Sequence, residues 1–108
     1  MERTRTPAAA QRLTIMFSAR DRSDHHSLAT EVLARARRAQ LAGATLLEGI
    51  VGQGRSGERH HHRLFGDDVP LAIVIVDDEA RITAFAADLG DMLRDALLVV
   101  EDVTVFRA

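Results

Sequence analysis

The fold is decided by the stretch Gly43-Ala-Thr-Leu-Leu-Glu-Gly-Ile-Val-Gly-Gln-Gly-Arg-Ser-Gly57. It predicts that a helix stops at Gly43 and that a strand runs from Thr45 to Val51. The strand leads into a segment rich in Gly, Arg and His, residues 52–68, which we expect to be a flexible loop. After this loop, the apolar run from Pro70 to Val76 predicts another strand that is buried on both faces or at a contact between subunits.

The residues before this stretch predict one strand and one helix. The segment from Arg12 to Ser18 is rich in β-branched and aromatic residues, which is typical of a strand. Apolar residues then recur at helical spacing from Leu28 to Leu41. Ser23 or Asp24 is expected to cap this helix, because both side chains can accept hydrogen bonds from the first free amides.

The residues after it predict a second helix and a last strand. Asp77 or Asp78 can cap a helix over Glu79 to Leu89, and Leu97 to Phe106 forms the last strand. The order is therefore βαββαβ, which predicts an α+β, ferredoxin-like fold. In this fold a four-stranded antiparallel sheet carries two helices on one face, and we expect oligomer formation to bury the other face.

Length and composition limit the class of protein. The 108 residues fit one domain, expected over residues 12–108 after a disordered lead-in over residues 1–11. A net charge of −2 and the absence of Trp and Tyr argue against a nucleic-acid partner. The absence of Cys excludes disulfides and thiol catalysis and suits the cytoplasm. The apolar run from Val69 to Val76 is far too short to span a bilayer.

A candidate anion site lies where the strand meets the loop. Gly52, Gly54 and Gly57 surround Arg55. Glycine lets the backbone approach a ligand closely, and backbone amides together with a guanidinium can hold a phosphate. The same residues also suit a flexible hinge at a strand end, and the sequence leaves both interpretations open.

The consecutive histidines His60, His61 and His62 are a candidate metal site. Neutral imidazoles bind transition metals, and in an extended segment His60 and His62 lie on the same face. The symmetry of a trimer could bring three copies of this segment together. The alternative is a solvated loop with titratable side chains.

No pattern of residues indicates an enzyme. The serines lack the strand–turn–helix context of a nucleophile elbow. The chain also lacks a catalytic triad, a metal-hydrolase motif and a full phosphate-binding loop. We therefore expect a protein without catalytic activity.

Four segments in this order resemble the uncharacterised PII-like family, domain of unknown function 190. They are Leu13-Thr-Ile15, Gly43 to Gly54, Asp67 to Asp77 and Val100-Glu-Asp-Val-Thr-Val105. This family is related in fold to the PII nitrogen-regulatory signalling proteins. The resemblance implies a homotrimer whose sheets line a central core and whose clefts between subunits bind adenine nucleotides. It also implies signalling to a partner protein, such as a membrane transporter, through residues 52–68.

The resemblance further implies ligand-binding residues. Gly43 and Thr45 resemble the Gly and Thr of the PII nucleotide cleft, and Gly52-Gln-Gly-Arg55 resembles the base of the PII loop. Arg107 is the counterpart of the arginine near the end of the last PII strand. The implied contacts are the backbone of Thr45, Leu46 and Leu47 for a base, and Gly52, Gly54, Arg55 and Arg107 for phosphate.

The chain also departs from the PII pattern. Ser56 stands where PII has a Gln that is important for metal-ATP, and Gly57 stands where PII has a Lys. The Gly-rich phosphate loop is reduced to Leu89-Gly-Asp-Met92, and the spacing from Gly43 to Gly52 is one residue longer than in PII. These departures favour a smaller or less charged nucleotide than ATP, or no nucleotide.

Three functional hypotheses follow. The first is a cytoplasmic, non-enzymatic regulatory protein that requires no cofactor and binds an adenine nucleotide between the subunits of a homotrimer. The second is a metal-binding trimer that resembles the copper-tolerance proteins and uses the His60–His62 cluster. The third is a protein-interaction module without a small ligand.

Overall fold

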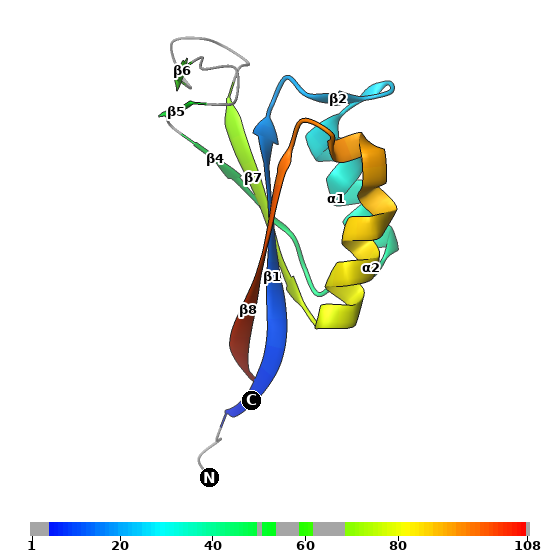
Figure 1. Ribbon diagram of the computed structural model, residues 1–108, viewed down its shortest axis with the longest axis vertical. Coiled ribbons are helices and arrows are strands. Elements are labelled where there is room, and N and C mark those ends of the chain that lie inside the picture. The colour runs from blue at the N-terminus through cyan, green and yellow to red at the C-terminus, as the bar shows by residue number, and fades with distance from the viewer. Residues whose placement is uncertain (1–4, 50, 54–58, 62–68, 108) are drawn as a thin grey trace.

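A computed structural model of the chain describes residues 5–49, 51–53, 59–61 and 69–107. Four strands form an antiparallel sheet in the order β4-β7-β1-β8 (Figure 1). Their bounds are β1 Thr6–Ser18, β4 Thr45–Glu48, β7 Pro70–Asp77 and β8 Leu97–Arg107. This sheet confirms the predicted α+β, ferredoxin-like arrangement.

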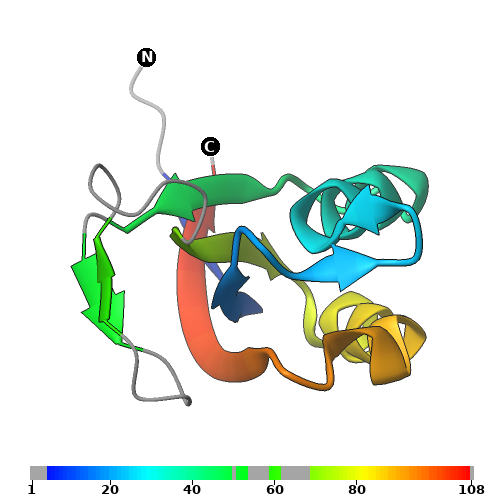
Figure 2. The same cartoon turned by 90° about the horizontal axis from the view of Figure 1, so that it is seen from above.

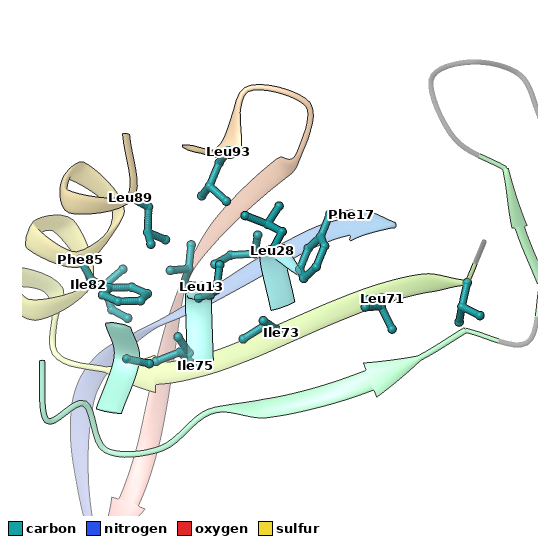
Figure 3. Packing of buried hydrophobic residues seen from close by; sticks show 14 residues of the cluster. Leu13, Phe17, Leu28, Leu71, Ile73, Ile75, Ile82, Phe85, Leu89 and Leu93 are labelled. Carbon is teal, nitrogen blue, oxygen red and sulfur yellow. The ribbon is translucent and has the colours of Figure 1, made fainter. Parts of the chain in front are cut away.

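Two helices cover one face of the sheet (Figure 2). They are α1, Leu28–Arg38, and α2, Glu79–Leu89, and a single turn of 3-10 helix, η1, continues α2 over Gly90–Leu93. The hydrophobic core lies between these helices and the sheet (Figure 3). It includes Leu13, Ile15, Ile73, Ile75, Ile82 and Leu89, each at most 2% exposed. Burial of such side chains is the main stabilising contribution of this layer.

Two short hairpins accompany the main sheet. β2, Arg22–Ser23, pairs with β3, His26–Ser27, just before α1. β5, Val51–Gln53, pairs with β6, Arg59–His61, within the segment that was expected to be a loop. The predicted strand from Thr45 to Val51 is therefore divided between β4 and β5. The remainder of the expected loop, residues 54–58 and 62–68, lies outside the described residues.

The first strand begins earlier than expected. Residues 6–11 pair with residues 102–107 of β8, so the prediction of a disordered lead-in is wrong over this part. β7 pairs with β1 only from Gln11 onward, and the two-stranded ribbon therefore extends beyond the sheet (Figure 1). The cause is pairing with a distant strand, which outweighs the weak strand propensity of three consecutive alanines.

Helix α1 begins at a different cap from either one expected. The N-cap is Ser27, whose hydroxyl accepts a hydrogen bond from Thr30 N at 3.1 Å. Asp24 instead occupies the turn between β2 and β3 with a φ of 50°. The small hairpin thus moves the start of the helix downstream of Ser23 and Asp24.

Gly43 does not end helix α1. The C-cap is Ala39, and Gln40 takes the left-handed backbone conformation with a φ of 56°. Gln40 N donates to Arg37 O, and Leu41 N donates to Ala36 O, which is the Schellman arrangement. The second helix follows the prediction, because Asp78 is its N-cap and accepts a bond from Arg81 N at 2.9 Å.

Candidate ligand site at the edge of the sheet

The sheet face opposite the helices is largely apolar and is left uncovered by the described residues of the chain. Along β7, burial alternates, with Leu71, Ile73 and Ile75 buried and the residues between them only half-buried. The register places Ala72, Val74 and Val76 beside Met16, Thr14 and Arg12 of β1, whose other neighbours are Leu97, Val99 and Glu101 of β8. We call this surface the open face; it consists of Arg12, Thr14, Met16, Leu47, Ala72, Val74, Val76, Leu97, Val99 and Glu101. The expectation that Pro70–Val76 is buried on both faces therefore does not hold within one chain.

One ion pair crosses the open face. Arg12 Nε and Nη2 donate to the two carboxylate oxygens of Glu101, each at 3.0 Å. This hydrogen bonding and the Arg12 charge lower the pKa of Glu101. Both side chains are close to half exposed, so in an isolated chain the pair contributes little to stability.

The outer edge of β4 presents backbone groups that point away from β7, beside the open face. Gly49 N donates to Pro70 O at 2.7 Å, which marks Gly49 and Pro70 as a hydrogen-bonded position of the antiparallel pair. Such positions alternate along the ladder, so the N–H and C=O of Leu46 point away from β7. Thr45, Leu46 and Leu47 are all exposed. These three residues were the expected contacts for a base.

The connection between α1 and β4, which we call the 39–44 turn, is bonded to two charged residues. Asp77 Oδ2 accepts a hydrogen bond from Ala42 N at 2.9 Å and forms an ion pair with Arg81, whose Nε lies 3.3 Å away. Arg81 Nη2 in turn donates to the carbonyl oxygens of Ala39, at 3.2 Å, and Gln40. Asp77 and Arg81 thus fix the turn from which β4 starts.

Asp77 is a buried carboxylate that stays ionised. Burial acts to raise its pKa, but hydrogen bonds from the backbone N–H groups of Ala42 and Asp78 and the charges of Arg81 and Arg107 outweigh burial. The net effect is a lowered pKa. Sequence reasoning treated Asp77 only as a possible helix cap. Its place two residues after Ile75, in step with the buried positions of β7, was the signal that its side chain faces inward.

The expected phosphate residues do not come together in one chain. Gly52 lies in β5, whereas Arg107 ends β8 at the opposite end of the molecule (Figure 1). Gly54 and Arg55 lie outside the described residues. Gly43 is exposed in the 39–44 turn, and a Cβ there would meet nothing within 4 Å. Any site that uses both Gly52 and Arg107 must therefore span two copies of the chain.

The expected metal site is described only in part. His60 and His61 lie in β6, and His62 falls outside the described residues. Elsewhere in the part of the chain that the structure describes, no group of three His, Cys, Asp or Glu side chains is placed to hold a metal ion. None of the described helices has the length and apolar character needed to cross a bilayer.

Comparison with known proteins identifies the family. The family model DUF190, described as "Uncharacterized ACR", matches residues 10–105. The chain belongs to the DUF190 family. A curated relative, the UPF0166 protein of Aquifex aeolicus (strain VF5), is 33% identical over 76 residues, which cover 68% of this chain and 71% of the relative.

The fold of this DUF190 protein is shared with PII-like proteins. CPII from Thiomonas intermedia K12, a nitrogen regulatory PII-like protein whose structure holds ADP, AMP and bicarbonate, aligns with a TM-score of 0.72 at 17% identity. The alignment covers 95% of this chain and 98% of CPII. A structure from Thermus thermophilus that is described as PII-like aligns with a TM-score of 0.64 at 12% identity, over 93% of this chain and 90% of that one. At these identities the likeness concerns the fold.

Proposed function

We propose that this DUF190 protein is a non-enzymatic regulatory protein that binds an adenine nucleotide between the subunits of a homotrimer. Residues 52–68 then carry the signal to a partner protein. A membrane transporter is the partner class that the resemblance to PII implies. The observation that carries the proposal is the division of the candidate site: Gly52 and Arg107 lie at opposite ends of the molecule, and no described element covers the largely apolar open face between them.

Assembly through the open face supports this proposal in two ways. Met16, Leu47 and Leu97 are 38%, 52% and 58% exposed, and contact with other copies removes these side chains from water. The same contact brings the β4 edge of one copy toward residues of another. A site whose residues are far apart in one chain requires such a contact. A closed ring of three copies uses the same pair of surfaces at each contact.

The edge of β4 supplies the chemistry for an adenine base. Adenine presents an acceptor, N1, next to a donor, the N6 amino group. The N–H of Leu46 can donate to the first, and its C=O can accept from the second. In the same pose guanine would place its N1–H against the Leu46 N–H and its O6 against the Leu46 C=O, so a site that holds the base in this pose favours adenine. Arg107 and the glycine-rich segment that begins at Gly52 supply a guanidinium and backbone amides for phosphate.

ADP and AMP are the first ligands to test, because CPII is bound to both in its structure and because the chain departs from the PII residues for metal-ATP. The test is calorimetric titration of the assembled protein with ADP, AMP and GDP. We expect heat from an adenine nucleotide and weaker binding of GDP. An absence of heat with all three would contradict the proposal, and a response to zinc or copper alone would favour the His60–His62 hypothesis.

One substitution tests the base contact directly. Leu46→Pro removes the N–H that points away from β7 and leaves the ladder with β7 intact, because proline is tolerated at an outward-facing edge position. Leu46→Ala is the matched control, since it shortens the same side chain and keeps the N–H. We expect Leu46→Pro to weaken ADP binding and Leu46→Ala to retain it. Equal affinities of the two variants would exclude this contact.

Assembly is tested on the open face. Val74 lies at its centre, opposite Thr14 and Thr45. Val74→Glu would place an unpaired charge between copies, which is strongly unfavourable. We expect the mass in solution to fall from three chains to one, with loss of ADP binding. A Val74→Glu protein that keeps the wild-type mass would show that the copies do not meet through this face.

A further inference from the structure

Asp77 is the one buried charged or polar residue among those that the structure describes. Its residue exposure is 7%, in a layer that otherwise consists of apolar side chains. Removing a carboxylate from water costs several kcal/mol unless donors replace the lost hydration. Two backbone donors, Ala42 N and Asp78 N, do so here together with the charge of Arg81, whose Nε lies 3.3 Å from Oδ2. Because burial of Asp77 is costly and its carboxylate oxygens are nevertheless bonded, we expect this residue to have a structural role.

Capping of α2 does not account for Asp77. Asp78 is the N-cap, and its Oδ1 accepts the bond from Arg81 N. The donor that distinguishes Asp77 is Ala42 N, which lies 35 positions away in the sequence. The carboxylate therefore joins the end of β7 to the 39–44 turn rather than closing the first turn of the helix.

Arg81 extends the same connection. It contacts Asp77 Oδ2 and also reaches two carbonyl oxygens, those of Ala39 and Gln40. A guanidinium can make these bonds at once because its donors form a rigid planar fork. Together the two side chains bind the turn at its start, Ala39–Gln40, and near its middle, Ala42, while Ala42, Gly43 and Ala44 are exposed to solvent.

We infer that Asp77 and Arg81 are positioning residues for the nucleotide base. They fix the 39–44 turn, and the turn fixes where β4 begins and hence the position of the Leu46 N–H and C=O. Neither side chain needs to touch the ligand. This inference rests on the proposed function, because it assigns a support to the strand edge that would contact adenine.

The experiment compares Asp77→Asn and Arg81→Gln with wild-type protein. Asp77→Asn removes the charge and keeps the shape, whereas Arg81→Gln removes the fork from a side chain that is 42% exposed and so carries less risk to folding. The matched control is Arg35→Gln. Arg35 makes a comparable set of side-chain bonds, to Glu31 Oε2 at 2.9 Å and to Asp88 O at 3.1 Å, and these join α1 to the end of α2 and not to the 39–44 turn.

Two measurements separate positioning from general stability. In hydrogen exchange, the amide of Ala42, which donates to Asp77 Oδ2, should exchange about tenfold faster in both test variants and not in Arg35→Gln, because only the turn has lost its bonds. In titrations, the affinity for ADP should fall by about tenfold while that for GDP falls less. The ratio of ADP to GDP affinity therefore drops toward one, which a loss of stability alone would not produce.

The outcomes distinguish this inference from the proposed function. If wild-type protein binds neither nucleotide, the proposed function and the inference both fail. If wild-type protein prefers ADP and both variants keep the same preference, the proposed function stands and the inference is overturned. Faster exchange at the turn together with a reduced preference for ADP supports it.

Discussion

The two faces of the sheet are built from the same four strands and differ in whether elements of the same chain cover them. On the helix-covered face, Leu13, Ile15 and Ile73 are inaccessible to solvent. On the open face, Met16, Leu47 and Leu97 keep between 38% and 58% of their surface exposed. The first face is completed by α1 and α2 of the same chain, whereas none of the described elements covers the second.

This difference separates the determinants of folding from those of function. Burial of apolar side chains on the covered face supplies most of the free energy that stabilises the single chain. The open face and the adjoining edge of β4 carry the residues that are proposed to act only when another copy binds. Substitutions on the two faces should therefore have different readouts, even when the residues are neighbours in sequence.

The largest expected effect is the difference in unfolding free energy between substitutions at two such neighbours, Ile15 and Met16. Ile15→Ala should cost about 4 kcal/mol of unfolding free energy, because it leaves a cavity at a fully buried position. Met16→Ala should cost less than about 1 kcal/mol in the single chain. The two variants are compared by urea unfolding, each combined with Val74→Glu, which is expected to keep the chains apart. Similar losses for the two would mean that the faces do not differ as described.

The ion pair on the open face gives the next largest effect. In the assembled protein Glu101→Gln should raise the dissociation constant of the assembly by about tenfold or more, because Arg12 then remains charged without a partner at a buried contact. In the Val74→Glu background the same change should hardly alter the urea midpoint, since both groups are then solvated. A small effect in both settings would place this pair outside the contact.

A smaller effect tests the helix-covered side at the end of α1. Gln40 has a φ of 56°, which is unfavourable for any residue with a Cβ. Gln40→Gly should stabilise the chain by about 1 kcal/mol, since glycine is the preferred residue at this position of a Schellman motif. Gln40→Ala keeps the strained backbone and should give no such gain in thermal unfolding. A gain with both substitutions would point to the Gln side chain instead.

The smallest effect is a change in acid stability. The pKa of Asp77 is lower in the folded chain than in the unfolded chain, so its carboxylate contributes stability that is present above the unfolded value and is lost as the pH falls through the folded one. The urea midpoint of Asp77→Asn should therefore fall less steeply than that of wild type between about pH 5 and pH 2. Parallel curves would show that the Asp77 pKa is not displaced. Glu31 and Glu101, whose pKa values are also lowered, remain in both proteins.

Local signals were sufficient for much of the fold. Asp78 at the start of α2 and Pro70 at the start of β7 are residues whose preferred positions are narrow, and both elements begin where they were expected. The predicted element bounds were wrong where pairing with a distant strand or an unusual backbone conformation determines the structure. The residues before Arg12 become a strand because β8 lies beside them, and glutamine at position 40 rather than glycine at position 43 supplies the left-handed residue.

The candidate site was harder to predict for the same reason. Thr45, Leu46 and Leu47 could be chosen by resemblance, but the outward direction of the Leu46 backbone depends on the register with β7. The bond from Asp77 to Ala42 joins two segments that no local pattern connects. The separation of Gly52 from Arg107 became visible only in the structure, where β5 and the end of β8 lie at opposite ends of the molecule.

The proposed adenine-nucleotide site forms only if other copies of the chain close the open face. The most direct test is the mass of the protein in solution, measured at micromolar concentration with and without ADP and paired with a calorimetric titration on the same sample. We predict the mass of three chains and saturable binding of ADP. A single-chain mass with no heat from ADP would contradict it.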